Sequence, residues 1–322
     1  KAITTKGNYS PALVAQSIGG GGDYALLDAS ATGEKRIGAS NNNTGISNSG
    51  NVTVENKAIL WTTGEFSAAL TAQAIGGGGG VISSAAGDLA FGTKNHLGAA
   101  QSGNVNVTNT NLVQTDGNYS SAIVVQSIGA GGGYIAGASG GASSLGALNG
   151  LSDTLGTSGN IIVNSIGKSI KPSGIGSTAL LVQSIGGGGG FLGSAKDGVS
   201  FGGTNLKNIS AGNINVTNSS LITTTGGASA ALVVQSLGGG GGVVSLTSNE
   251  NIQLGGNNVI DAKSGDLNLK NTGNITTTGN TSPLIMVQSI GGGGGYTTLN
   301  NEVAKADNTQ TLQMGDDGSL RA

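Results

Sequence analysis

The sequence predicts an all-β protein, a right-handed parallel β-helix (β-solenoid) of six repeats of about 53 residues each. One segment recurs six times, which is typical of a chain that stacks similar units on one another. Short β-branched runs punctuated by Gly and Asn indicate strands and turns, and no ten-residue stretch has helical periodicity. The 63 glycines among 322 residues lack the every-third-residue period of collagen, so they fit turns in an ordered chain.

The recurring segment joins an apolar run to Gln, then Ser or Ala, then Ile or Leu, and then a glycine run. Its fourth copy reads ALLVQSIGGGGG over residues 179–190. The six glutamines are Gln16, Gln73, Gln126, Gln183, Gln235 and Gln288. With these as anchors, the units are about 1–57, 58–110, 111–167, 168–219, 220–272 and 273–322. We interpret residues 1–322 as one solenoid segment, and the lack of an atypical polar unit at either end leads us to expect a piece of a longer chain.

Each unit contains the same succession of short predicted strands. A Gly-Asn turn opens the first strand (GNVTV at 50–54), an Ile-Thr-Thr strand follows (ITTT at 222–225), and the Gln strand comes next. After the glycines, a further strand ends in Phe-Gly or Leu-Gly, as at 201–202. Like strands should stack at about 4.8 Å, with right-handed connections. Two or three coils per unit would give roughly 12 to 18 coils and a rod of about 60–85 Å.

The Gln strand is apolar on both faces, which predicts that it is covered on both sides. Stacked glutamines are then expected to hydrogen-bond to one another as a ladder. Whether the Gln side chain points inward or outward is left open by the sequence.

The Phe and Tyr residues fall into three recurring slots, which predicts contacts between like residues of neighbouring units. Core filling is favoured over a ligand-binding ladder. The slots hold Tyr24, Tyr134, Phe191 and Tyr296; Tyr9, Phe66 and Tyr119; and Phe91 and Phe201.

The glycine runs predict a sharp corner or a segment lying against another backbone, because glycine permits positive φ and close approach. The third run reads Gly129-Ala130-Gly131, so one Cβ is accepted at its second position. By analogy, Gly187→Ala is expected to be nearly neutral and Gly189→Val clearly destabilising.

The distance from the Gly-Asn turn to the next Gln is 23 or 24 residues in every unit, whereas the stretch after the glycines varies in length. A constant scaffold with variable loops is how solenoids carry binding surfaces. We therefore expect any binding to lie in loops 134–158 and 296–314, although no binding residue is assigned. Deleting 136–150 is expected to leave the fold intact.

Composition argues against several partners and cofactors. The net charge is −2 and no long basic run occurs, which argues against nucleic acid. No apolar span is long enough for a transmembrane helix, and we expect no membrane contact within this segment. With no cysteine, disulfides and Cys-based zinc sites are excluded.

No catalytic or metal site is predicted, no cofactor is expected, and we interpret the chain as a non-enzyme. The apparent motifs each lack a necessary part. His96 is the only histidine and has no triad partners, and Lys168-Ser169 lacks the first P-loop glycine because Ile162 stands there. Gly188, Gly190 and Gly193 match a dinucleotide pattern with no helix after it; Asp23, in a calcium-repeat-like GGGD, has no equivalent in other units; and the acids Glu302, Asp307, Asp316 and Asp317 are scattered.

The string S-x-A-L-V-x-Q-S-I-G-G-G-G-G, preceded by V-T-N and I-T-T-T-G, resembles repeats in the large passenger domains of Gram-negative autotransporters. The closest copies are Ser229 to Gly242 and Ser282 to Gly295, and the resemblance covers essentially the whole chain. It implies a β-helical passenger exported to the cell surface, often adhesive or part of a fibre. The family's signal peptide and membrane barrel are not seen, and no family binding residue is carried over.

Two functions follow as hypotheses. The first is a surface adhesin or stalk that presents variable loops to a host or neighbouring cell. The alternative is a subunit of an extracellular fibre or sheath that self-associates. Ice binding through Thr rows is a third, but Trp61 and Gln114 interrupt those rows.

Overall fold

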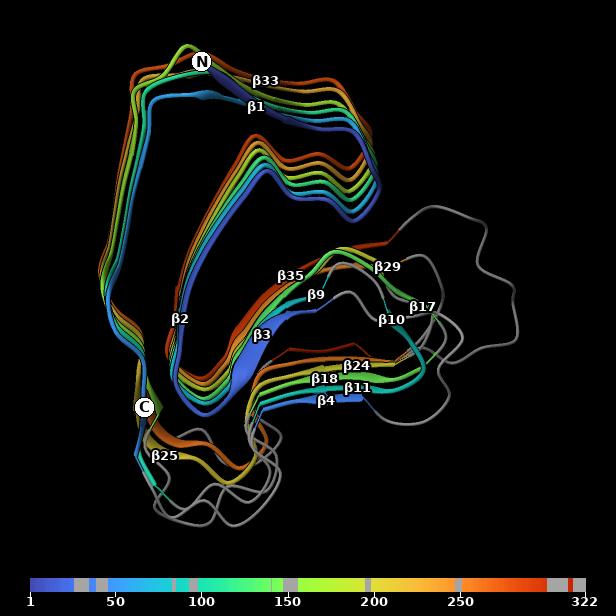
Figure 1. Ribbon diagram of the computed structural model, residues 1–322. Coiled ribbons are helices and arrows are strands. Elements are labelled where there is room, and N and C mark those ends of the chain that lie inside the picture. The colour runs from blue at the N-terminus through green and yellow to red at the C-terminus, as the bar shows by residue number, and fades with distance from the viewer. Residues whose placement is uncertain are drawn as a thin grey trace.

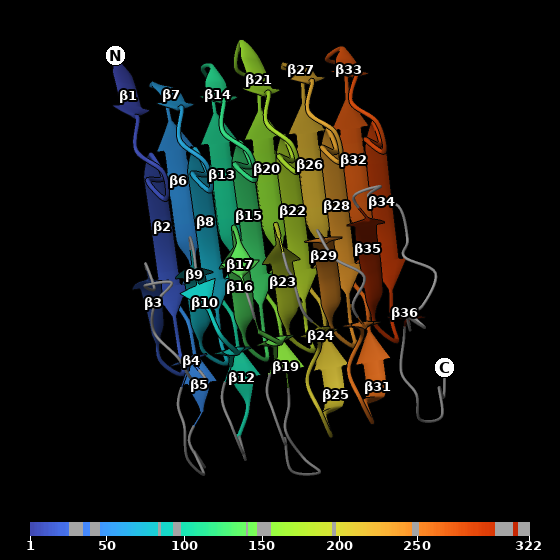
Figure 2. The same ribbon diagram turned by 90° about the vertical axis from the view of Figure 1, so that its right-hand side faces the viewer.

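The chain folds into a stack of parallel coils. The computed structural model describes residues 1–25, 35–38, 46–82, 85–92, 98–139, 141–146, 156–194, 198–246, 251–299 and 312–314. In this part of the chain every regular element is a β-strand, and every strand pairs in parallel with its counterparts in neighbouring coils. Figure 1 looks down the stack, so that the six coils nearly overlap, and Figure 2 shows them side by side.

Each coil passes through six sheets, which we call F, A, B, C, D and E in chain order. Sheet F comprises β6 (Val52–Asn56), β13 (Val105–Asn109), β20 (Ile161–Ser165), β26 (Ile214–Asn218) and β32 (Leu267–Asn271). Sheet A comprises β1 (Ala2–Thr5), β7 (Ile59–Thr62), β14 (Val113–Thr115), β21 (Ser169–Pro172), β27 (Leu221–Thr224) and β33 (Ile275–Thr277). Sheet B comprises β2 (Leu13–Ile18), β8 (Leu70–Ile75), β15 (Ile123–Ile128), β22 (Leu180–Ile185), β28 (Leu232–Leu237) and β34 (Ile285–Ile290).

The other sheets follow the glycine runs. Sheet C comprises β3 (Gly22–Ala25), β9 (Gly79–Ile82), β16 (Gly132–Ile135), β23 (Gly189–Leu192), β29 (Gly241–Leu246) and β35 (Gly294–Leu299). Sheet D comprises β4 (Lys35–Ile37), β11 (Leu89–Phe91), β18 (Ser143–Leu145), β24 (Val199–Phe201), β30 (Ile252–Leu254) and β36 (Leu312–Met314). Sheet E comprises β5 (Ser47–Asn48), β12 (Ala100–Gln101), β19 (Gly156–Thr157), β25 (Lys207–Ser210) and β31 (Ile260–Lys263), and a small extra sheet joins β10 (Ala85–Ala86) to β17 (Ala138–Ser139).

The all-β parallel solenoid predicted from the sequence is confirmed, and each repeat forms a single coil. Gln126 stands opposite Gln73 in one neighbouring coil and opposite Gln183 in the other. The expectation of two or three coils per unit is therefore wrong. Six coils separated by five strand spacings make a stack of about 25 Å, so the expected rod of about 60–85 Å is also wrong.

The coil winds with a right hand. In Figure 1 the chain climbs the side that carries sheet F, crosses the top through β1 and β7, and returns downward through β2, which is a clockwise path. Figure 2 is turned so that the nearer part of Figure 1 lies at its left, where the blue N-terminal coil stands. The chain therefore recedes as it turns clockwise, in keeping with the right-handed preference of parallel crossovers.

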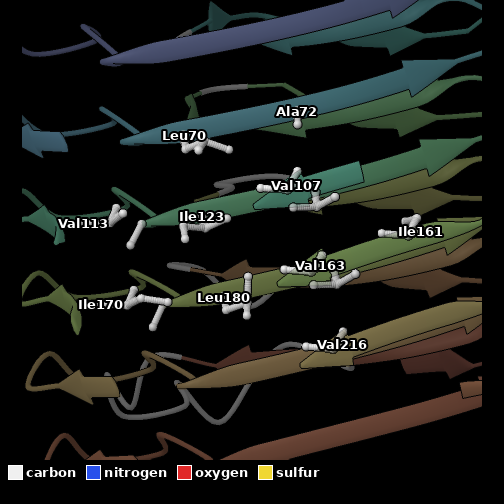
Figure 3. Packing of buried hydrophobic residues seen from close by; sticks show 14 of the residues in the cluster. Leu70, Ala72, Val107, Val113, Ile123, Ile161, Val163, Ile170, Leu180 and Val216 are labelled. Carbon is white, nitrogen blue, oxygen red and sulfur yellow. The ribbon is translucent and has the colours of Figure 1, made fainter. Parts of the chain in front are cut away.

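Sheet B divides the interior into two apolar layers. On one side, alternate residues such as Leu180 and Val182 meet Val163 of sheet F and Ile170 of sheet A, all within 1% of full burial. Figure 3 shows this layer. On its other side, Leu181 packs with Phe191 of sheet C. Every residue of β22 is buried, which confirms the prediction that this strand is covered on both faces.

A further apolar layer lies between sheets C and D. Leu192 of sheet C packs with Phe201 and Leu145 of sheet D, and all three are fully buried. The chain thus doubles back on itself after the glycine run, as Figure 1 shows. This doubling explains how a repeat of about 53 residues fills one coil without a hollow centre.

Candidate functional site

The recurring glutamine is part of the scaffold. Each Gln Nε2 donates to the Oε1 of the Gln in the next coil, and the distances from the first pair to the last are 2.8, 2.6, 2.7, 2.8 and 2.6 Å. Gln183 also donates to the carbonyl of Gly190 in sheet C at 3.1 Å. The side chain therefore points toward sheet C, with no exposed surface at Gln183. The predicted ladder is confirmed, and the Gln side chains of the ladder point inward, between sheets B and C.

The serine after Gln also serves the scaffold. Ser184 Oγ accepts a hydrogen bond from the backbone amide of Gly212 at 2.8 Å and donates to the carbonyl of Gly159 at 3.1 Å. These two glycines begin the Gly-Asn turns of successive coils, so the serine links the two turns by hydrogen bonds. In the second coil Ala74 occupies this slot, and the amide of Gly103 is bound by Ser49 Oγ at 3.1 Å instead.

The glycine runs are ordered and tightly stacked. Gly189 has φ +133°, and a Cβ built there would lie only 2.0 Å from the carbonyl oxygen of Gly241. At Gly187, a Cβ would lie 2.5 Å from the carbonyl carbon of Gly239. The expectation that Gly187→Ala is nearly neutral is therefore wrong, because backbone atoms occupy the space.

Ala130 is accepted in the third run because its own coil differs. It is fully buried in a small cluster with Ile209. A Cβ added to Gly156 would lie 3.2 Å from Ala130 Cβ, and Gly156 pairs with Ala100 of the preceding coil. In the third coil the alanine methyl group therefore belongs to the glycine run, at Ala130, and sheet E has Gly156. In the second coil the glycine run has no alanine, and the methyl group belongs to Ala100 of sheet E.

The aromatic slots contact like slots in neighbouring coils, as predicted. The rings of Tyr9, Phe66 and Tyr119 stack at 5.1 and 5.3 Å, and those of Tyr134 and Phe191 stack at 5.0 Å. Phe66 has φ +55°, a left-handed conformation rarely adopted by bulky residues. Burial raises the pKa of Tyr134 to about 12. These rings belong to the packed scaffold, as the core interpretation expected.

The motifs that imitate cofactor sites are placed as follows. Gly188 and Gly190 are buried backbone of the stacked run, and Lys168 precedes a strand, β21, where a P-loop requires a helix. Asp23 is exposed in β3, and its Oδ1 accepts from the amide of Tyr24 at 2.7 Å. His96 and the acids Glu302, Asp307, Asp316 and Asp317 lie outside the described residues. Across the described ranges, no three acidic or histidine side chains gather to hold a metal ion.

The segments expected to be binding loops are partly scaffold. Residues 134–158 include the second half of β16 and all of β17, β18 and β19, and both Tyr134 and Leu145 are buried. Deleting 136–150 would remove a strand of sheet D, so the expectation that the fold survives is wrong. Within 134–158, residue 140 and residues 147–155 lie outside the described residues. The second predicted loop, 296–314, contains β36 and most of β35, and its residues 300–311 lie outside the described part of the chain.

An open groove lies on the outer face of sheet D. It has a volume of about 430 Å³ and is lined by β18, β24 and β30 with the residue before each strand. Ser144, Ser200 and Gln253 form one outward row across three coils, and Ser200 Oγ donates to Gln253 Oε1 at 3.4 Å. Their neighbours along the strands, such as Val199 and Phe201, are buried. The groove therefore presents uncharged hydroxyl and amide groups on a rigid floor.

The chain matches no family model, no curated protein and no solved structure. Among the described residues there is no helix long and apolar enough to cross a membrane. The proposal for its function therefore rests on the geometry above and on the sequence resemblance.

The groove was missed in the sequence because its strands are only three residues long. Each contributes one outward side chain between two inward ones, as in Val199-Ser200-Phe201. A triplet of this kind is too short to show the alternation of a strand. The available signal was the recurrence of such triplets with a glycine directly after each one, as at Gly92, Gly146, Gly202 and Gly255.

Proposed function

We propose that this chain is a non-enzymatic adhesin or stalk segment of a Gram-negative cell-surface passenger protein. The resemblance of its repeats to autotransporter passengers supports the location and export route. The stacked ladders support the mechanical part of the proposal, because each coil is tied to the next by six sheets and by buried side-chain hydrogen bonds. The expected partner is a molecule on a host or neighbouring cell.

The observation that carries the adhesive part is the position of the groove. Sheet D stands between the two connections whose length varies from coil to coil, one from sheet C and one to sheet E. The C–D connection runs from Ala25 to Lys35 in the first coil but only between the equivalent residues Leu192 and Val199 in the fourth. A rigid floor edged by variable segments is the usual arrangement of a recognition surface on a repeat scaffold.

The test is adhesion of beads coated with the purified chain to a monolayer of cultured epithelial cells. Ser200→Arg places a bulky charge in the middle of the groove, and bead retention should fall about tenfold. Asn215→Arg is the matched control, because Asn215 is exposed on the outer face of sheet F. Both variants should keep the circular dichroism spectrum and melting temperature of the parent.

Two outcomes contradict the proposal. One is equal retention of the parent, of Ser200→Arg and of uncoated beads. The other is formation of long filaments by the purified chain, dependent on its concentration in negative-stain images, which would favour the fibre function instead.

A further inference from the structure

Trp61 is exposed on the outer face of sheet A, far along the coil from the groove of sheet D. It is the only tryptophan in the chain and 41% exposed. Its neighbours in β7, Leu60 and Thr62, are fully buried against the first apolar layer. The indole is therefore held on a rigid strand with its side chain turned to solvent.

Asp116 fixes the orientation of the indole. Trp61 Nε1 donates to Asp116 Oδ2 at 2.6 Å, and Gln114 Nε2 donates to Asp116 Oδ1 at 2.8 Å. The amide of Asp116 in turn donates to the carbonyl of Thr62 at 2.9 Å. Each carboxylate oxygen thus receives one side-chain hydrogen bond and, having two lone pairs, can accept another.

The row around Trp61 is polar. Trp61 stands between Thr4 of the preceding coil and Gln114 of the following one, and Lys171 comes one coil further on. Successive members of this row are about 4.8 Å apart. The surface therefore combines one flat apolar ring with hydroxyl, amide, carboxylate and ammonium groups.

We propose that Trp61, Asp116 and Gln114 form a saccharide-binding platform. A pyranose ring has an apolar face of C–H bonds and a rim of hydroxyls, so its face can lie on the indole while a hydroxyl donates to Asp116. Aromatic side chains provide a large contact area at low cost in conformational entropy, and the two hydrogen bonds to Asp116 already hold this one in place. The platform does not depend on the groove of sheet D.

Two other occupants fit less well. A protein partner favours a well-packed apolar centre around its aromatic anchor, whereas the neighbours of Trp61 in the row are Thr4, Gln114 and Lys171. A quaternary ammonium ligand is typically enclosed by a cage of several aromatic rings, whereas Trp61 stands in its row between Thr4 and Gln114 with no second aromatic ring beside it there.

The single tryptophan makes the test direct, because all indole fluorescence reports on this position. The purified chain is titrated with three tetrasaccharides, namely β-1,4-linked glucose, β-1,4-linked N-acetylglucosamine and α-1,4-linked glucose. At least one should shift or quench the emission saturably, with a Kd of about 1 mM. Calorimetry should give the same constant, and the Kd should be unchanged in Ser200→Arg.

Two variants separate the platform from general effects. Asp116→Asn can still accept from Trp61 Nε1 but loses the charge, so affinity should fall about tenfold while the emission spectrum of the free chain stays close to the parent's. Thr223→Ala, two strands away from β14 on the same sheet, is the matched control and should bind like the parent. The proposal is overturned if none of the three sugars changes the emission up to 50 mM (roughly fifty times the expected constant), if Asp116→Asn binds as tightly as the parent, or if choline alone produces the change.

Discussion

The two halves of each coil differ in how much their number of residues varies from one coil to the next. The constant half comprises sheets F, A and B, and the variable half comprises sheets C, D and E. Between sheets F and A the chain runs from Asn56 to Ile59 in one coil and from Asn271 to Ile275 in another. Between sheets C and D the span changes more, from Ala25 to Lys35 in the first coil against Leu192 to Val199 in the fourth.

Side-chain ladders, more than strand pairing, restrict the length of the constant half. Both halves pair their strands in register. The constant half also has polar side chains that must meet their copies, such as Asn56 Nδ2 with Asn109 Oδ1 at 2.7 Å and the Ser67 amide with Ser120 Oγ at 2.9 Å. An inserted residue there would leave buried donors unpaired, whereas an inserted residue in a connection after sheet C can bulge outward and leave the strand pairing unchanged.

The largest expected effect is at the glycine run that joins the two halves. Gly189→Val should destabilise the chain by at least about 4 kcal/mol, because a β-branched residue at positive φ would also overlap the backbone of the next coil. Urea unfolding followed by circular dichroism measures the change. Gly198→Ala is the control, since its Cβ would meet only Asn251 O at 3.5 Å, and it should stay within about 1 kcal/mol of the parent. Equal stabilities would show that the run has no required conformation.

A smaller effect is expected from the glutamine ladder. Gln183→Leu should cost about 3 kcal/mol, because it leaves Gln126 Nε2 and Gln235 Oε1 without their ladder partners in a buried layer. Gln16→Leu removes only one ladder bond, at a partly buried site, and should cost about half as much. The comparison uses the same urea titration. A cost at Gln183 no greater than that at Gln16 would contradict the view that buried ladders hold the constant half in register.

The smallest effect is expected from length changes in the variable half. Insertion of Gly-Ser-Gly between Leu192 and Val199 should change the free energy of unfolding by less than about 1 kcal/mol, because loop closure depends weakly on length. The same insertion between Asn218 and Leu221 should cost about 3 kcal/mol or more, because Asn218 and Ser220 are fully buried and hydrogen-bonded there. Similar costs at the two places would remove the distinction between the halves.

The ladder and the double burial of sheet B could be predicted because they recur in every unit. A Gln flanked by apolar residues on both faces of a strand must find a partner, and its copy is the nearest one. The number of coils per repeat could not be predicted, because the pattern of short strands is the same whether the unit closes once or several times. What decides it is the folding back of sheets C and D onto sheet B, and this depends on packing between residues such as Phe191 and Leu181.

The candidate sites also depend on the number of coils per repeat, which the sequence did not predict. Trp61 and Gln114 become neighbours only when one repeat makes one coil, and the bond from Trp61 to Asp116 follows from it. The analogy from Ala130 to Gly187 failed for a related reason. Ala130 is accommodated beside Gly156 of its own coil, whereas a Cβ at Gly187 would lie 2.5 Å from the carbonyl carbon of Gly239 in the following coil, a clash that depends on how closely neighbouring coils stack.

The glutamine ladder has a direction. From Gln16 to Gln235, each Nε2 donates to the glutamine of the following coil, and the same amide group in Gln73, Gln126 and Gln183 also donates to a glycine carbonyl of its own coil. A reversed amide would set donor against donor on one side and acceptor against acceptor on the other, so the row can only turn over as a whole. Each completed coil therefore acts as a template that fixes the orientation of the next glutamine amide. If folding proceeds from the N-terminal side, the orientation of the first amide sets that of each following one in turn.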